Sequence, residues 1–399
     1  MSNYFVQIIR LAWQQGLADF KEIAIDGSKF QAVSSPRHLK NAEDLEKALK
    51  RVRADIEDYM YKAGLLDDDE DDDISNITKL RTKIKELQKL EKELKSKQNN
   101  LSKRRQQIKN EYKQHHKINL AEPDARVMHN VNGRFKLPAY NAQLSVDTKT
   151  HLIVANNAIS DNVDFDQFDK QHQSIENNLN CDRRRVYVAD AGYHNLEQLE
   201  YVYTYDINAV IASPHKENAF KQSKSKYFRH HQFIYDSKHD YYNCPAGHKL
   251  TYSKNYNKGK WRGRIYSTTA CKECAIRHSC LPADRLYKNL RRENRRCFAE
   301  QMAQKSKGIH GKASLKRRAM SVETVFGNIK HNLGFRRFNL KGLKAAHAEL
   351  NLVCIAHNIN KMFRIGLLNS QKIRRQLKII WQSCQRTIYF YLIPKRAFV

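Results

Sequence analysis

The sequence lacks any run of about 18 consecutive apolar residues, which a membrane-spanning helix would need. Its N-terminal stretch carries Gln, Asp and Trp among the apolar residues and has no small-residue cleavage site, so it does not fit a signal peptide. The eight cysteines do not form a secreted disulfide framework, because four of them crowd between Cys244 and Cys280. We therefore expect no membrane association and a reducing, intracellular compartment.

Acidic residues are scarce in the last third of the chain. Residues 261–399 hold 30 Lys and Arg but only six Asp and Glu, which gives this segment a net charge of +24. The first 260 residues add only +6 to the total of +30, and they contain a wholly acidic tract at 67–73. This regional basicity favours a polyphosphate partner such as DNA or RNA over a merely soluble basic protein.

Two stretches between residues 40 and 120 have the pattern of long, charged helices. From Ile77 through Leu94 and Leu101 to Ile108, apolar residues recur in three- and four-residue steps or whole heptads, which places one stripe along a helix. The pattern predicts a hairpin with arms at 41–62 and 77–112 and the acidic tract as its solvated loop. Packing of the two arms on each other is the simpler interpretation, and dimerisation through them is the alternative.

Beyond Pro138 the apolar residues alternate with a period of two, as they do in strands. The chain then alternates between predicted strands and helices, which indicates an α/β domain with a mixed sheet. In order, the predicted elements are strands at 140–147 and 151–155 joined by a turn at 148–150, a helix at 164–178, a strand at 186–189, a helix at 195–203 and a strand at 209–212.

Three acidic residues stand in settings that suit metal chemistry. Asp26 closes a short predicted strand, Asp190 closes the strand 186–189, and Glu323 lies on a helix with apolar neighbours. Acids at the ends of neighbouring strands converge on one crevice, where carboxylates repel one another unless cations bridge them. For one such Asp a turn or cap role is the simpler interpretation, but the joint pattern favours a two-metal Mg²⁺ or Mn²⁺ site for phosphoryl transfer.

Five short motifs give the sequence a more specific likeness. They occur in the order Ile25–Lys29, Tyr140–Gln143 with Val146-Asp147, Val188–Tyr193, Val322-Glu323 with Phe326-Gly327 and Lys330, and Gly334–Phe338 with Lys341–Leu343 and His357-Asn358. In these motifs the chain resembles the DDE transposases of bacterial insertion sequences, from about residue 20 to 364.

This resemblance implies a ribonuclease-H-like mixed sheet, with a helical-hairpin insertion after the first strand and a zinc-ribbon-like cysteine insertion before the last catalytic helix. It implies that Asp26, Asp190 and Glu323 bind Mg²⁺ or Mn²⁺ for cleavage and strand transfer of DNA. The implied partners are double-stranded element ends and target DNA, bound by a homodimer in the bacterial cytoplasm at the nucleoid. A catalytically dead DNA-binding derivative and a nuclease of the same fold are the alternatives.

Several basic residues surround the predicted catalytic helix. Lys330 follows Glu323 by two helical turns, and the family places a DNA-contacting Lys there. Arg317 and Arg318 precede Glu323, and Arg336 and Arg337 follow it, so we expect all of them to line a DNA channel. Asp147 lies in a predicted hairpin strand, and we expect it to be structural.

The cysteine-rich segment has the spacing of a zinc site. Cys244, Cys271, Cys274 and Cys280 include one C-x2-C pair, which suits tetrahedral zinc in a small module without a large core. His248 or His278 could replace one thiolate, and reduced thiols in a loop-rich module are the alternative.

Only 25 residues precede Asp26, whereas such transposases usually carry an N-terminal domain that recognises the element ends. We therefore expect either that another component recognises the ends or that the chain is truncated. The predicted division of the chain is residues 1–39 (first helix and strand), 40–125 (helical arm), 126–212 (core), 213–290 (cysteine-rich insertion), 291–364 (catalytic helix region) and 365–399 (basic tail).

Overall fold

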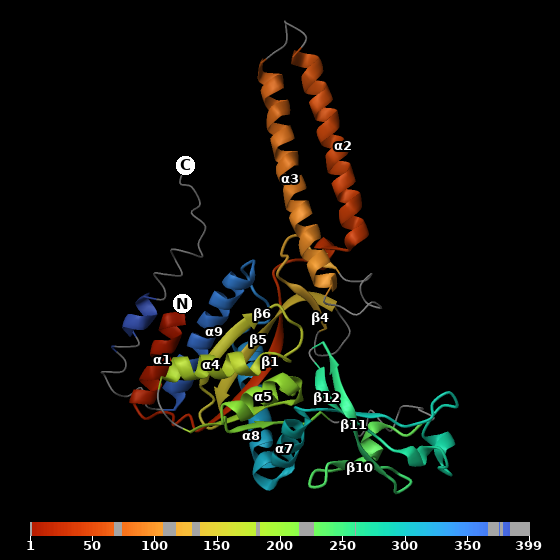
Figure 1. The fold of residues 1–399 in the computed structure, drawn as a ribbon. Coiled ribbons are helices and arrows are strands. Elements are labelled where there is room, and N and C mark those ends of the chain that lie inside the picture. The colour runs from red at the N-terminus through yellow and green to blue at the C-terminus, as the bar shows by residue number, and fades with distance from the viewer. Residues whose placement is uncertain are drawn as a thin grey trace.

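The structure of the chain is a computed structural model that describes residues 2–67, 74–106, 117–129, 136–180, 184–214, 227–259, 261–365, 375 and 378–383. It contains a central sheet covered by helices, a long helical arm and a second, smaller sheet (Figure 1). The predicted acidic loop after Asp67 and most of the predicted basic tail lie outside the described residues.

The central sheet is mixed, as predicted. Strand β1 pairs antiparallel with β5 and parallel with β7, and β7 pairs parallel with β8. The path through the sheet is β4-β5-β1-β7-β8, and β6 also pairs with β5. The strands are β1 (Glu22–Gln31), β4 (Arg126–His129), β5 (Lys136–Asp147), β6 (Ile153–Ile159), β7 (Val186–Ala189) and β8 (Ala209–Ile211).

The first strand is longer than the sequence predicts. We expected it to end at Asp26, but β1 continues to Gln31 because β5 pairs with it without a break from Ile23 to Gln31. The short strand β7 does end at Ala189, level with Ile25. Asp26 therefore lies within a strand, whereas Asp190 follows the end of one.

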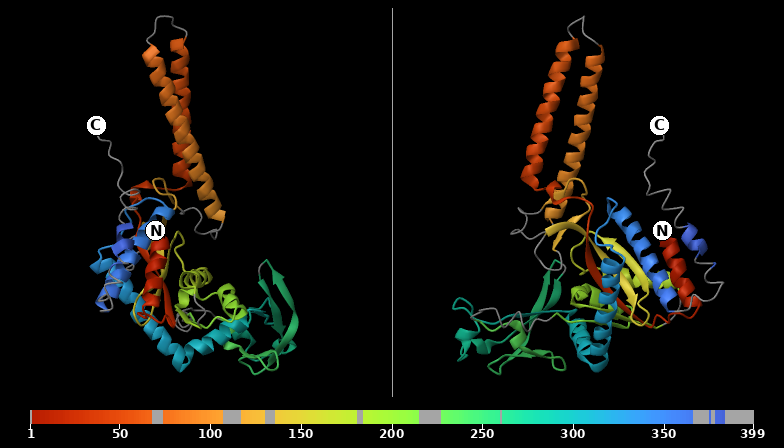
Figure 2. Two further views of the ribbon diagram at one scale, coloured as in Figure 1. Left: turned by 90° about the vertical axis from the view of Figure 1, so that its left-hand side faces the viewer. Right: turned by 180° about the vertical axis from the view of Figure 1, so that it is seen from behind.

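Six helices surround the central sheet in the described part of the chain. Helix α8 packs against β1, β5 and β7, whereas α4 and α9 pack against β5 and β6. Helix α1 lies beside α9, on the side of the sheet away from the second sheet (Figure 2). No described helix is long and apolar enough to cross a membrane. The helices are α1 (Ser2–Gln14), α4 (Phe168–Leu179), α5 (Leu196–Thr204), α7 (Arg296–Lys307), α8 (Ile309–Gly327) and α9 (Leu343–Arg364).

The predicted helical hairpin forms the arm that projects from the sheet in Figure 1. Its helices are α2 (Ala42–Asp67) and α3 (Ile74–Gln106), whose contacts bury Leu94 and Leu101 of the predicted stripe. A ribbon of β2 (Leu39–Lys40) and β3 (Ile118–Asn119) lies at the base of the arm. The two helices of the arm therefore pack on each other, which is the simpler of the two interpretations of the sequence.

The cysteine-rich segment forms the second sheet, in the order β13-β12-β11-β10-β9. It has a small core of its own, built mainly from the aromatic side chains of Phe233, Tyr242 and Tyr266. This module extends three residues beyond the predicted boundary at 290, because β13 pairs with β12 as far as Glu293. Its strands are β9 (Ile234–Asp236), β10 (Tyr241–Asn243), β11 (Lys249–Lys258), β12 (Trp261–Ser267) and β13 (Leu290–Glu293).

An aromatic cluster joins the end of β1 to the loop between α8 and α9. The ring of Phe338 is fully buried and packs edge-on against Tyr140 and Phe30, with centroids 5.6 and 6.1 Å apart. The amide of Phe338 also donates a hydrogen bond to the carbonyl of Gln31. This cluster holds the segment that follows α8 against the first strand.

We expect Phe338→Ala to lower the free energy of unfolding by about 3–5 kcal/mol, because it removes a buried ring and leaves a cavity. Urea unfolding followed by circular dichroism measures the change. Phe363→Ala is the matched control, since Phe363 is 63% exposed and its removal should cost little. Equal effects of the two changes would contradict the assignment of Phe338 to the core.

Candidate active site

Strands β1 and β7 bring Asp26 and Asp190 to one place. Their parallel register sets Ile25 beside Ala189, and an Asp comes directly after each of these two residues. Asp26 accepts a hydrogen bond from the amide of Gly27, and Asp190 accepts one from the amide of Gly192, both at 2.8 Å. The two strand acids therefore converge as expected.

The guanidinium of Arg318 lies between these carboxylates. One of its nitrogens is 2.7 Å from Asp26 Oδ1 and 3.3 Å from Asp190 Oδ2. Only 12% of the Arg318 side chain is exposed, and it also donates to the carbonyl of Ile25. We predicted that Arg318 contacts DNA, whereas in this structure it is the internal counter-ion of the two acids.

The pKa of Asp26 is raised from 3.8 to about 6. Burial is the main cause, because it disfavours the charged carboxylate, and the neighbouring carboxylates of Asp190 and Asp164 add to the effect. Arg318 and the amide of Gly27 oppose it. The carboxylate of Asp26 therefore takes up a proton more readily than a carboxylate in water.

Glu323 is not brought to the two strand acids. Its neighbours Val322 and Val325 are buried against the sheet, whereas Glu323 itself is exposed. Its side chain forms no hydrogen bond or ion pair with any described residue. Throughout the described part of the chain, no three His, Cys, Asp or Glu side chains are positioned to hold a metal ion.

The donor set nevertheless fits a hard divalent cation. Asp26 and Asp190 offer carboxylate oxygens, which Mg²⁺ and Mn²⁺ prefer. The side chain of Asn141 is fully buried beside Gly27, and its carbonyl oxygen has no hydrogen-bond partner among the described residues. A buried oxygen of this kind is a ready ligand, so the residues present suit the predicted cofactor.

The sequence analysis assigned no function to Asp164, Asn141 or Gln143. Asp164 accepts hydrogen bonds from both amide side chains, and these donors come from β5. The sequence does contain a signal for Asn141 and Gln143, because polar residues alternate along β5 from Asn141 to Asp147. All of these polar residues are buried in the structure. Asp164 gave no such signal, because it lies in a loop with several other Asp residues.

Lys330 reaches the first strand instead of extending the face of Glu323. Its ammonium donates to the hydroxyl of Ser28 at 2.6 Å and lies 4.8 Å from the centre of the Phe30 ring. Burial lowers the pKa of Lys330. A π-helical turn over Asn328–Asn332 follows α8 and rotates Lys330 relative to Glu323, which a regular helix would not do.

The other predicted basic residues also contact the protein itself. Arg317 pairs with Glu22 at 2.6 Å, and Arg336 donates to the carbonyl of Lys330 at 3.0 Å. Arg337 donates to the carbonyl of Val33. All three remain exposed, so they keep surface available for a polyanion.

Asp147 has the structural role expected of it. Its carboxylate accepts hydrogen bonds from the amide and the hydroxyl of Thr150, which closes the hairpin between β5 and β6. It therefore serves the turn and is not needed for the candidate site.

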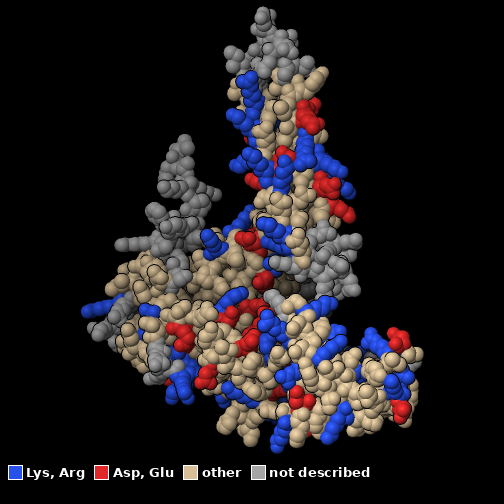
Figure 3. All heavy atoms as spheres, viewed as in Figure 1, with Lys and Arg blue, Asp and Glu red and all other residues tan. Residues whose placement is uncertain are grey.

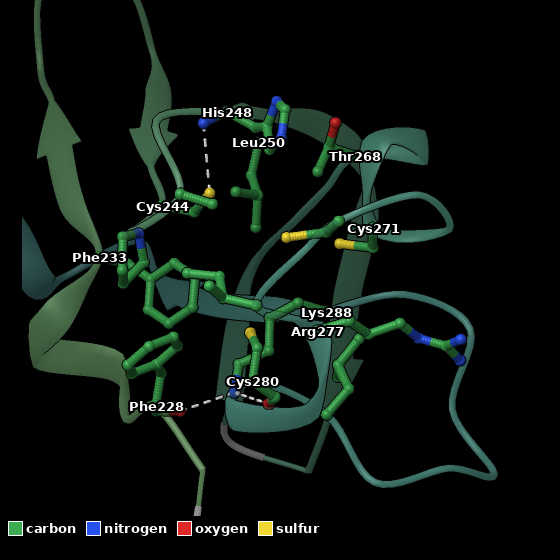
Figure 4. A pocket seen from close by; sticks show the side chains of 15 residues that line it. Phe228, Phe233, Cys244, His248, Leu250, Thr268, Cys271, Arg277, Cys280 and Lys288 are labelled. Atoms are coloured by element: carbon green, nitrogen blue, oxygen red, sulfur yellow. Dashed lines mark hydrogen bonds between the residues drawn. The ribbon is translucent and has the colours of Figure 1, made fainter.

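The four clustered cysteines line one pocket in the second module (Figure 4). The amide of His248 donates to the sulfur of Cys244 at 3.3 Å, within a tight turn that Gly247 completes at a φ of +82°. Burial, with a contribution from the three neighbouring thiols, raises the pKa of Cys280. The thiols thus share one pocket without forming a cluster that could hold a metal as placed.

The charges are arranged around the site as well as within it. On the face shown in Figure 3, Asp and Glu gather below the arm, Lys and Arg lie over the neighbouring surface, and the arm itself carries both kinds of charge. An acidic centre with a basic surround suits a phosphate backbone that approaches a cation-binding site.

Residues 243–363 match a family model described as "Transposase DDE domain". The match includes Glu323 and Lys330 and the whole cysteine cluster, and it confirms the predicted resemblance to DDE transposases. No curated protein and no solved structure gives a significant match to the chain.

We expect Asp26→Asn to stabilise the protein above pH 6. The folded carboxyl holds its proton more tightly than the unfolded one, so wild-type stability falls as the pH rises from about 4 to 6. The gain should approach about 1–3 kcal/mol at pH 8 and vanish near pH 4. Urea unfolding in EDTA tests this, with the exposed Glu323→Gln as control; a destabilised Asp26→Asn at pH 8 would show that the attraction to Arg318 outweighs burial.

Proposed function

We propose that the chain, whose residues 243–363 match the transposase DDE domain, is a metal-dependent polynucleotidyl transferase that cleaves and joins the DNA strands of an insertion sequence. The observation that carries this proposal is the convergence of Asp26 and Asp190 at neighbouring strands, beside the helix that bears Glu323.

The topology supports a ribonuclease-H-like core. A long antiparallel pair, β1 with β5, is followed by two parallel strands, β7 and β8, and helices lie between these strands in the chain. In sheets of this kind, ligands bind beyond the carboxyl ends of the parallel strands. Asp190 stands at that position, directly after β7.

We assign metal binding to Asp26, Asp190 and Glu323. Divalent cations at such a site would activate the attacking oxygen and stabilise the leaving oxygen of a phosphodiester. Asp26 and Asp190 are already adjacent, whereas Glu323 is exposed on α8 and must be reoriented to join them. Arg318 neutralises the two strand acids in the protein alone and must withdraw from them when cations bind.

The proposed partner is double-stranded DNA, as element ends and as target. Lys330 is a second basic residue close to the strand acids: its ammonium bonds to Ser28 and feels the charge of Asp26, so it would contact a phosphate there. Arg317, Arg336 and Arg337 would contact the backbone farther along the surface. We further propose that a homodimer binds the DNA, because two element ends need two sites.

We expect Asp26→Asn, Asp190→Asn and Glu323→Gln each to abolish Mn²⁺-dependent cleavage of DNA that carries the element ends. Each change removes a proposed ligand and leaves the basic surface unchanged, so salt-dependent DNA binding should persist. A nicking assay and a binding titration measure the two properties.

Asp147→Asn is the control for these variants, since Asp147 serves only the hairpin turn. Cleavage that survives all three ligand changes would refute the triad. Binding without any cleavage by the wild type would instead select the catalytically dead alternative, and cleavage of RNA–DNA hybrids without strand joining would select a nuclease.

We also propose that the second module binds structural zinc through Cys244, Cys271, Cys274 and Cys280. The four thiols line the same pocket, and the bond from the His248 amide to Cys244 suits a thiolate ligand. The module has only a small core, so a metal would contribute much of its stability.

Elemental analysis of the purified chain should find about one zinc per molecule. Cys274→Ser should lower the zinc content and destabilise the module, whereas Cys297→Ser should change neither, because Cys297 lies outside the pocket. Full zinc content in Cys274→Ser, or none in the wild type, would refute this assignment.

A further inference from the structure

Asp164 lies beside the strand acids, on the loop between β6 and α4. Its Oδ1 accepts hydrogen bonds from Asn141 Nδ2 at 2.7 Å and from Gln143 Nε2 at 2.6 Å. Gln143 in turn accepts a hydrogen bond from the buried hydroxyl of Tyr193. Because two amides from β5 hold one oxygen, the carboxylate is fixed in orientation and its Oδ2 is left for another partner.

Two glycines, Gly27 and Gly192, leave room for the side chain of Asp164 beside the strand acids. A Cβ at Gly27 would lie 2.4 Å from Asp164 Oδ1, which is closer than real Cβ contacts. A Cβ at Gly192 would lie 3.4 Å from Asp164 Oδ2 and 2.9 Å from Asp190 Oδ1. The carboxylates of Asp164 and Asp190 therefore both border the space above the backbone of Gly192.

The local charge is not balanced. Arg318 contacts Asp26 and Asp190, but Asp164 forms no ion pair with any described residue. Three carboxylates, with the Arg318 guanidinium and the Lys330 ammonium near Asp26, leave an excess of negative charge in a partly buried place, which is unfavourable without a further cation.

An independent feature points to the same ligand. Asn141 is fully buried, and its Oδ1 has no hydrogen-bond partner in the described part of the chain. This oxygen lies 2.8 Å from the position that a Gly27 Cβ would take, next to Asp164 Oδ1. An unpaired buried carbonyl is unfavourable, and a bound cation would satisfy it.

We propose that Asp164 is a further acidic ligand of the site and binds a divalent cation of the Mg²⁺ or Mn²⁺ class together with Asp190 and Asn141 Oδ1. Gln143 is a positioning residue, because it orients Asp164 and does not face the cation. The inference rests on the proposed function in that both put cations at Asp190. It gives the site an acid that is already in place, whereas Glu323 has to turn toward it.

Titration calorimetry with Mn²⁺ on the full chain, without DNA, tests the proposal. We expect Asp164→Asn to weaken Mn²⁺ binding by at least about 10-fold, because it removes a charged ligand and keeps the shape of the side chain. Asp166→Asn is the matched control: it lies two residues away on the same loop, is exposed, and bonds to Asn195 instead. Unchanged Mn²⁺ affinity in Asp164→Asn would overturn the proposal.

A measurement on the wild type avoids the risk that the variant misfolds. Fe²⁺ in place of Mg²⁺, with ascorbate and peroxide, cuts the backbone next to bound iron. We expect cuts near residue 164 as well as near 190–192. Cuts near 190–192 with none near 164 would overturn the proposal.

A parallel nicking assay separates this inference from the proposed function. A wild type that binds Mn²⁺ through Asp164 but does not cleave DNA would support the cation site and refute the transferase. A wild type that cleaves DNA, with an Asp164→Asn variant that binds Mn²⁺ normally, would refute the Asp164 site alone.

Discussion

The arrangement of the candidate site depends on the guanidinium of Arg318. Asp26 and Asp190 come from different strands, and without a cation between them they would repel each other in a place with little water. Loss of the cation from a buried ion pair typically costs about 3–5 kcal/mol, and the cost is smaller here because 39% of the Asp190 side chain is exposed to solvent. Together with the Arg317–Glu22 pair, this contact also fixes how α8 lies along β1.

The position of α8 explains why Glu323 is exposed. Residues of an α-helix advance by about 100° each, so side chains five positions apart point roughly 140° away from each other. With Arg318 against the strand acids, Glu323 cannot face them at the same time. Lys330 does return to β1, because the π-helical turn after Gly327 changes the rotation of the helix. Assembly of the proposed triad therefore requires the Arg318 side chain to move or α8 to rotate.

The sequence predicts the bounds of those strands and helices that local residue patterns determine. The strand Val186–Ala189 has the predicted bounds, because apolar periodicity and end signals determine them. The predicted end of β1 was wrong, because pairing with β5 determines where the strand ends. The polar residues after Ile25 do not end it. Asp164 escaped notice for a similar reason: its place beside Gly27 and Gly192 depends on contacts between segments far apart in the chain. The same holds for Arg318, whose partners lie more than 100 residues away.

Charge alone gives a reason for cations at this site. A phosphodiester carries negative charge, and it would have to approach Asp26, Asp190 and Asp164, of which only the first two have a basic partner. Coulomb repulsion between such groups grows as the surroundings become less polar, so bound DNA would increase it by excluding water. The basic surface beyond the acids attracts the DNA backbone but cannot neutralise the acids themselves. Divalent cations remove this conflict, because they turn the acidic centre from a barrier to the phosphate into its binding site.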